Sequence, residues 1–433
     1  MSEKTVQQQF GVGKNILLGF QHLFAMFGAT VLVPLLTGLN PSVAIFCAGA
    51  GTLIFHFLTK GKVPVFLGSS FAFIGVIIIT ATQISGVDAS VDGFIGSEAY
   101  QSALPYVSGG IICAGAVYLV LALIVKLIGA ERVMKIFPPV VVGPMIMVIG
   151  LTLAPTAFTN ILNAPVSDVV PDVLWMRWVI ALVVIITMVV VSIFAKGFFK
   201  LVPIIIAIGV GYLVAALMGQ VDFSGFQGGA NLGFQVPAFY LPKFDARAIA
   251  IITPVAIVTF MEHIGDITTN GAVVGKNFVK DPGLHRTLMG DGVATMFAGF
   301  LGGPANTTYG ENTGVLAVTK NYNPATLRIA AVFAIIMSFF GVFAAFLGSI
   351  PGAVMGGVSI LLFGMIATIG LRTLATAQLD FSHSRNLIII SIMLVIGLGL
   401  QGGIQFSETF TLSNIFLSAI AGIVLNLVLP KEI

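Results

Sequence analysis

The chain has 433 residues, of which 57% are apolar and only 9% are charged, and its mean hydropathy is +1.06. A soluble domain carries about 25% charged residues, so this composition excludes a soluble fold and makes the lipid bilayer a partner of the chain. The net charge of +3 is too small to indicate binding of nucleic acid.

Apolar segments follow one another along the whole chain. A helix needs about 20 apolar residues to cross the bilayer, and the polar N-terminus lacks a signal-peptide pattern, so the first span is expected to be retained. The third and tenth segments are short and rich in Gly, Ser and Thr, which favours a short β-strand followed by a half-helix. The predicted fold is an all-α polytopic membrane protein with fourteen transmembrane segments, near 14–36, 42–59, 66–82, 104–127, 138–157, 176–195, 201–219, 247–270, 286–303, 305–320, 325–348, 352–371, 385–400 and 411–429.

Lysine and arginine residues predict the orientation of these spans. If the N-terminus is cytoplasmic and the spans alternate, 17 of the 20 basic residues lie at cytoplasmic ends, and only Arg177, Lys243 and Arg247 lie at outer ends. Both termini are therefore expected in the cytoplasm, with an even number of spans through the cytoplasmic (inner) membrane.

Four of the 17 acidic residues fall inside predicted spans: Glu262, Asp266, Asp291 and Glu311. An ionised carboxylate at membrane depth costs at least a few kcal/mol, and no basic residue is predicted at that depth to pair with these four. They are therefore expected to meet a water-filled cavity, a ligand or protons.

Two weak internal matches suggest a repeat. Residues 137–143 resemble residues 350–356, and the stretch around Phe71 resembles the stretch around Tyr309. Each pair is seven spans apart, and because seven is odd, the two repeats would be inverted in the membrane. Inverted repeats with interrupted spans are typical of secondary transporters. The alternative is that these segments are glycine-rich packing helices.

Glu262 and Asp266 are four residues apart, so they share one face of a helix. Their repulsion favours a proton on one of them. The alternative is a pair of structural carboxylates held by neighbouring hydroxyl groups.

The string from Asn306 to Asn312 lacks the Gly-Lys-Ser/Thr ending of a phosphate-binding loop. The predicted binding site suits a flat polar heterocycle. The carboxylates of Glu262 and Glu311 and the exposed backbone can form hydrogen bonds with it, and the rings of Phe71 and Tyr309 can cover its faces. A metal site is not favoured, because no paired His or Cys spacing occurs, and no cofactor is expected.

The sequence leaves the roles of three further residues open. Asp291 either relays protons or ties spans together. His22 is as suited to a buried structural role as to binding a ligand. His263 points about 100° away from Glu262 around the helix, so a supporting position behind the site is expected.

Several strings resemble the nucleobase–ascorbate transporter (nucleobase/cation symporter-2) family, most of all its bacterial uracil-permease branch. The similarity runs along nearly the whole chain, and the string Thr-Thr-Tyr-Gly-Glu-Asn is its most specific part. The strings are residues 21–30, 68–73, 262–263, 281–284 and 306–314.

The resemblance implies two inverted repeats of seven spans, a proton-coupled transport activity and a homodimer. It implies a cytoplasmic tail (1–13), a core domain in two parts (14–130 and 247–350) and a gate domain in two parts (131–246 and 351–433). Glu262 and Glu311 would bind the nucleobase, the backbones of Phe71 and Gly310 would donate to its carbonyl oxygens, and Tyr309 would line the pocket.

Two positions point to different branches of the family. At the position of Asp266, uracil permeases resemble one another in having His, and xanthine-type members have Asp, as this chain does. At the position of Glu311, the purine branch typically has Gln and the uracil branch has Glu, as this chain does. We expect uracil as the substrate, with a purine such as xanthine as the main alternative. A channel is a further alternative; an enzyme and an anion exchanger are not favoured, because no catalytic spacing and no buried cation is predicted.

Overall fold

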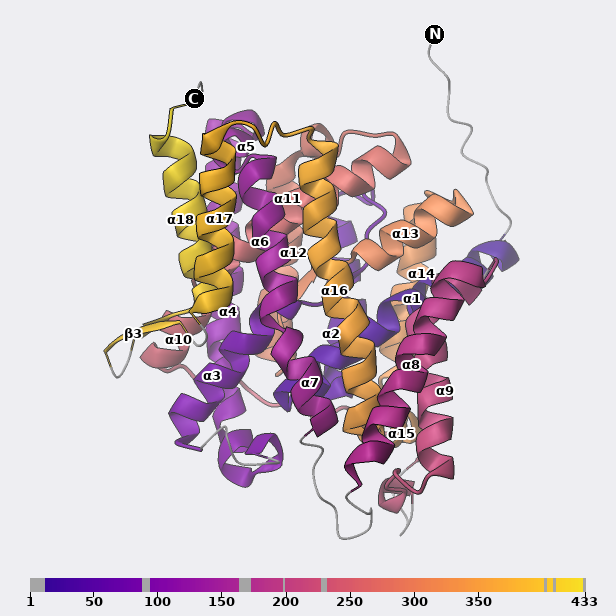
Figure 1. The fold of residues 1–433 in the computed structure, drawn as a ribbon. Helices are drawn as coiled ribbons and strands as arrows, with labels where there is room; N and C mark the ends of the chain where they lie inside the picture. Colours follow the sequence, from indigo (N-terminus) through magenta and orange to yellow (C-terminus); the bar gives the residue numbers. More distant parts are fainter. Residues whose placement is uncertain are drawn as a thin grey trace.

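The computed structural model describes residues 12–87, 94–162, 173–197, 199–226, 232–400, 403–407 and 410–430. Most of them are helical (Figure 1). The helices of ten or more residues are α1 (Val12–Thr37), α2 (Pro41–Leu58), α3 (Ile74–Ser85), α4 (Glu98–Ile128), α6 (Pro139–Thr152), α8 (Leu174–Phe194), α9 (Pro203–Leu217), α11 (Val255–Val274), α12 (Leu284–Phe300), α13 (Gly310–Thr319), α14 (Pro324–Met337), α16 (Gly352–Thr376), α17 (Ser384–Gly399) and α18 (Asn414–Val428). The shorter elements are β1 (Leu67–Ser69), α5 (Ala130–Ile136), α7 (Ala154–Leu162), α10 (Ala246–Ile252), β2 (Asn306–Thr308), α15 (Gly341–Gly348), β3 (Ile404–Ser407) and β4 (Phe410–Leu412).

Within these described ranges, seven helical stretches are long and apolar enough to cross a membrane, and five shorter apolar helices accompany them. The chain is therefore a multi-pass membrane protein. The seven are Gly13–Thr37, Pro41–Leu58, Glu98–Ile128, Pro139–Leu162, Leu174–Phe194, Ala246–Val274 and Gly352–Thr376.

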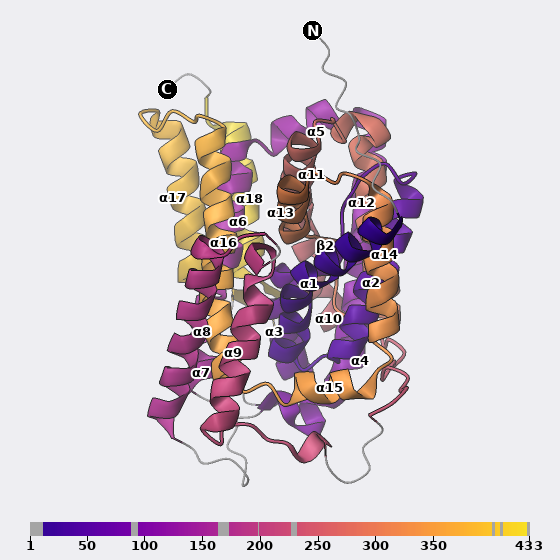
Figure 2. The same ribbon diagram turned by 90° about the vertical axis from the view of Figure 1, so that its right-hand side faces the viewer.

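Three predicted spans are broken into two helices. The span predicted over 138–157 breaks at Leu153 between α6 and α7, and the span over 247–270 breaks before Pro254 between α10 and α11. Proline has no backbone N–H, so a helix ends readily where Pro155 and Pro254 stand. The third break separates α14 from α15, which runs across the lower edge of the bundle in Figure 2.

The centre of the bundle holds two short antiparallel strands from distant parts of the chain. Leu67 pairs with Thr308, Gly68 with Thr307 and Ser69 with Asn306. Backbone hydrogen bonds extend the pair at both ends. The Ser70 N–H donates to the Ala305 carbonyl at 2.8 Å, and the Tyr309 N–H donates to the Phe66 carbonyl at 3.0 Å. From this pair α13 runs upward and α3 downward in Figure 2, so two helices begin at one central point.

The two strands can be aligned with each other residue by residue. Counted from the first strand residue, Leu67 corresponds to Asn306, so Phe71 corresponds to Gly310 rather than to Tyr309. The residues before the two helices fit this alignment. Ser70 and Tyr309 occupy the same position in it, and both have extended backbone directly before the first helical turn. This alignment of the two strands differs by one residue from the predicted match of Phe71 with Tyr309, and the repeat itself stays a prediction.

Buried side chains hold the strand pair in place. The Asn306 amide donates to the Cys47 carbonyl at 3.1 Å and to the Ala294 carbonyl at 3.3 Å. At the other strand, the Leu67 N–H donates to the Thr52 hydroxyl at 2.9 Å. Backbone polar groups at membrane depth need protein partners, since lipid offers none, and these contacts supply them.

Candidate functional site

Helix α11 carries two of the predicted carboxylates next to the strand pair. Asp266 accepts a hydrogen bond from the Thr308 hydroxyl, the last residue of β2, at 2.9 Å. Glu262 lies one helical turn earlier, and its Oε2 atom is buried without a hydrogen-bond partner among the described residues. A buried carboxylate oxygen without a partner is costly, which marks this atom as a position for a ligand or a proton.

Glu311 lies in the first turn of α13, directly after Gly310. A negative charge is favourable at a helix N-terminus because the backbone dipoles leave partial positive charge there. The Glu262 carboxylate lies within electrostatic range of both Glu311 and Asp291. No lysine or arginine of the described ranges forms an ion pair with any of these three carboxylates. The structure therefore places Asp266 and Glu311 next to the strand pair and Glu262 one helical turn from Asp266, with no ion-paired lysine or arginine in the described part of the chain.

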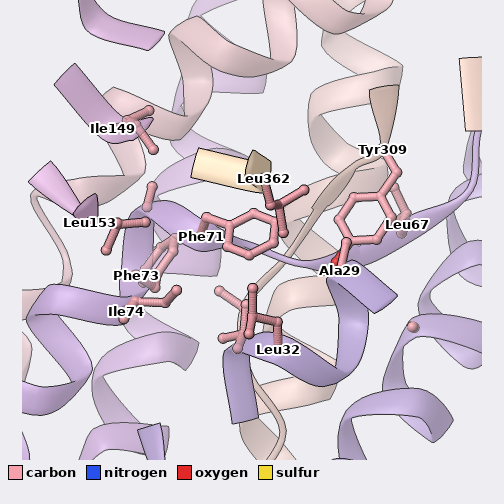
Figure 3. Packing of buried hydrophobic residues seen from close by; sticks show 14 of the residues in the cluster. Ala29, Leu32, Leu67, Phe71, Phe73, Ile74, Ile149, Leu153, Tyr309 and Leu362 are labelled. Atoms are coloured by element: carbon pink, nitrogen blue, oxygen red, sulfur yellow. The ribbon is translucent and has the colours of Figure 1, made fainter. Parts of the chain in front are cut away.

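Phe71 and Gly310 begin the two helices that leave the strand pair. The first N–H groups of any helix have no acceptor within it, so two sets of donors start here. Gly310 is exposed, and a Cβ atom added to it would meet no atom within 4 Å. Phe71 is 6% exposed and packs its ring edge-on against Phe363 of α16, with ring centroids 6.1 Å apart. Figure 3 shows its ring next to Leu362 and Leu32.

Tyr309 is built into the scaffold more tightly than a side chain that only lines a pocket. Its hydroxyl donates to the Ser69 carbonyl at 3.0 Å and accepts from Thr30 at 3.4 Å. Its ring lies against Gly68, where an added Cβ would come within 2.3 Å of it. Figure 3 places the ring beside Leu67 and Ala29. Tyr309 therefore fastens β2 to β1 and to α1.

His263 and Asp291 form a buried pair between α11 and α12. The His263 Nδ1 atom lies 2.7 Å from the Asp291 Oδ2 atom, and both side chains are 0% exposed. The other ring nitrogen lies 2.9 Å from the Thr287 hydroxyl, which donates to the Leu284 carbonyl. His263 thus has two partners on α12, while Asp291 Oδ1 is buried without a partner among the described residues.

His22 of α1 contacts α13 rather than the carboxylates. The Asn312 amide lies 3.2 Å from the His22 Nδ1 atom and donates to the His22 carbonyl at 3.0 Å. The Nε2 atom of His22 is buried without a partner in the described part of the chain. This contact ties the first span to the helix that carries Glu311.

Sequence reasoning missed four residues that contact the predicted ones. Thr308 and Asn312 stand in the string that drew attention to Glu311, so their position was visible although their partners were not. Thr287 and Phe363 carried no local signal, because each meets its partner from a different helix.

Comparison with known proteins places the chain in a family. A family model described as "Permease family" matches residues 13–406. A uracil permease of Bacillus caldolyticus is 45% identical over 98% of this chain and 94% of its own, and one of Bacillus subtilis is 43% identical over 96% and 92%. The structure of SLC26A9 has a TM-score of 0.68 at 12% identity, covering 97% of this chain; the chain spans only 66% of that protein. The last likeness concerns the fold alone. The chain belongs to the permease family, the nucleobase–ascorbate transporters that its motifs resemble.

Proposed function

We propose that this protein takes up uracil across the cytoplasmic membrane together with protons, by alternating access. Glu262 and Glu311 would accept hydrogen bonds from the ring N–H groups of the base, and the backbone N–H groups of Phe71 and Gly310 would donate to its carbonyl oxygens. The observation that carries this proposal is the buried, unpartnered Glu262 Oε2 atom beside a strand pair from which two helices begin. The uracil permeases among the relatives support the choice of base.

The proposed topology has fourteen spans in two inverted repeats, with both termini in the cytoplasm. The symmetric hydrogen bonds Ser70–Ala305 and Tyr309–Phe66 support the inverted relation. A core domain (14–130 and 247–350) would hold the strand pair, and a gate domain (131–246 and 351–433) would move against it, after a cytoplasmic tail (1–13). The Phe71–Phe363 contact would be one point where the two domains meet. A homodimer is proposed from the family resemblance.

The proton would be carried by the carboxylates around the strand pair. Glu262 and Asp266 are the proposed carriers, and the buried His263–Asp291 pair would support them from α12. Asp266 already accepts a hydrogen bond from Thr308, so it has less capacity left for a substrate than Glu262 has. This favours a small pyrimidine held by Glu262 and Glu311 over a purine that also needs Asp266.

Gly310→Ala tests the proposed approach of the base to the backbone. The added methyl group meets no protein atom, so the fold should tolerate it, and alanine suits a helix better than glycine by about 1 kcal/mol. The methyl would occupy space that the base needs, so uracil affinity measured by calorimetry should fall at least about tenfold. Gly314→Ala is the matched control, because Gly314 is also exposed in α13 with nothing within 4 Å of an added Cβ. Equal affinity in both variants contradicts the proposed backbone contact.

Transport itself is tested in vesicles that contain the purified protein. An inward proton gradient should drive accumulation of labelled uracil, an uncoupler should abolish it, and external uracil should exchange with labelled uracil inside. Xanthine should compete poorly. Uptake driven by a sodium gradient at fixed pH would refute proton coupling, and uptake that neither saturates nor exchanges would identify a channel.

A further inference from the structure

We propose that a basic cavity between α4, α5 and the C-terminal end of α11 binds the phosphate headgroup of an anionic phospholipid. The cavity has a volume of about 1070 Å³. Four cationic side chains line it, Lys126, Arg132, Lys276 and Lys280, against the single carboxylate of Glu131. The site is independent of the proposed uracil site.

The described residues leave the four cations of this cavity without ion pairs. No ion pair among the described residues involves any of the four cations. Asp281 follows Lys280 directly, but both its carboxylate oxygens contact Lys62, at 2.5 and 2.7 Å. Four neighbouring cations repel one another, so an anion of fixed position between them would lower the energy of the whole cluster.

The cavity lies on a different side of α11 from the carboxylates. Thr268 and Ala272 line it, two and six residues beyond Asp266. At 100° per residue these side chains point about 200° and 240° around the helix from Asp266. A ligand in the cavity would therefore touch neither Glu262 nor Asp266, which sets it apart from the transported substrate.

Position and polarity favour a lipid over a soluble anion. Helix α4 has 31 residues, about 46 Å at 1.5 Å per residue, so it is longer than the ~30 Å hydrocarbon layer is thick. Its last turn, which carries Lys126, would lie at the level of the headgroups. Next to Lys126 in this turn, Leu127 is 75% exposed and Ile128 is 39% exposed, and both line the cavity. Acyl chains would cover these apolar side chains while the phosphate meets the cations.

A bound lipid would connect two parts that the proposed mechanism moves. All but the first residue of helix α5 belongs to the proposed gate domain, and α11 carries Glu262 and Asp266 of the core domain. The headgroup would contact cations of both, Arg132 on α5 and Lys276 just after α11. The inference concerns lipid binding, and it stands or falls separately from the identity of the transported base.

The test uses the full-length chain, purified without lipid, in detergent micelles titrated with phosphatidylglycerol or phosphatidylcholine, with bound lipid counted by native mass spectrometry. The test variant carries Lys126→Gln, Arg132→Gln, Lys276→Gln and Lys280→Gln. The matched control carries Lys196→Gln, Lys200→Gln, Lys320→Gln and Arg372→Gln, four exposed cations that do not line the cavity. Both variants change the net charge equally, and circular dichroism with size-exclusion chromatography checks that each is folded.

We expect phosphatidylglycerol to bind at least about tenfold more tightly than phosphatidylcholine, and to lose that preference in the test variant alone. High salt should weaken binding, because exposed charges are screened. Equal binding of the two lipids, or equal loss in both variants, would overturn the proposal. Displacement of the lipid by inorganic phosphate or glycerol phosphate at comparable concentration would show a site for a soluble anion instead.

Discussion

Glu311→Gln is expected to weaken uracil binding by about ten- to a hundredfold. The amide keeps the shape of the side chain but presents an N–H group where the base also offers one. A buried polar group left without a partner costs about 1–3 kcal/mol, and about 1.4 kcal/mol corresponds to a tenfold change in affinity. Calorimetry on the purified variant measures this change directly.

The chain offers a matched control for this variant. Glu98 also lies in the first turn of a helix, α4, and is exposed, so Glu98→Gln makes the same chemical change away from the strand pair. It should leave uracil affinity within about twofold of the original. If Glu311→Gln behaves like Glu98→Gln, Glu311 does not accept a hydrogen bond from the base.

Asp266→Asn is expected to abolish most proton-driven accumulation of uracil while changing equilibrium binding by no more than about threefold. The asparagine oxygen can still accept the hydrogen bond from the Thr308 hydroxyl, so the local structure should persist. The amide cannot take up and release a proton near neutral pH, so the coupling step should fail. Accumulation under an imposed proton gradient and calorimetry with uracil measure the two effects separately.

The same variant distinguishes the two candidate substrates. A purine has a second ring with an additional N–H group, which Asp266 could accept one helical turn beyond Glu262. If the original protein binds xanthine tightly and Asp266→Asn loses that binding, the substrate is a purine and the assignment to uracil is wrong. Thr308→Val is the companion change, because it removes the hydroxyl that holds Asp266 and leaves both carboxylates in place.

The acids of the site were predictable because the membrane makes them conspicuous. Glu262, Asp266, Asp291 and Glu311 stand in segments where charge is costly, so their depth alone marked them. Their partners were not predictable. His263 meets Asp291 28 residues further along, on another helix, and nothing in the sequence fixes how two helices face each other. Whether these residues bind and couple as proposed remains a prediction.

Of two helix breaks, the sequence predicts only the one that a local residue causes. The break at Pro254 follows from a proline that the sequence displays. The break between α14 and α15 has no such signal. There the backbone of Phe339 and Gly341 bonds to residues about 100 positions earlier, with the Gln235 N–H donating to Phe339 at 2.7 Å and the Gly341 N–H donating to Gly233 at 2.8 Å. A contact between distant segments ended the helix, and local propensity could not reveal it.

The central strand pair also has a consequence for biosynthesis. Leu67–Ser69 is synthesised early, yet its partner strand, Asn306–Thr308, leaves the ribosome more than 230 residues later. Until then the first strand lacks its backbone hydrogen bonds to the second strand, which lipid cannot replace. Before pairing, the first strand would need water as its hydrogen-bond partner, either within the insertion machinery or in a hydrated gap between spans. The strand pair itself would close in one late step, when the second strand arrives.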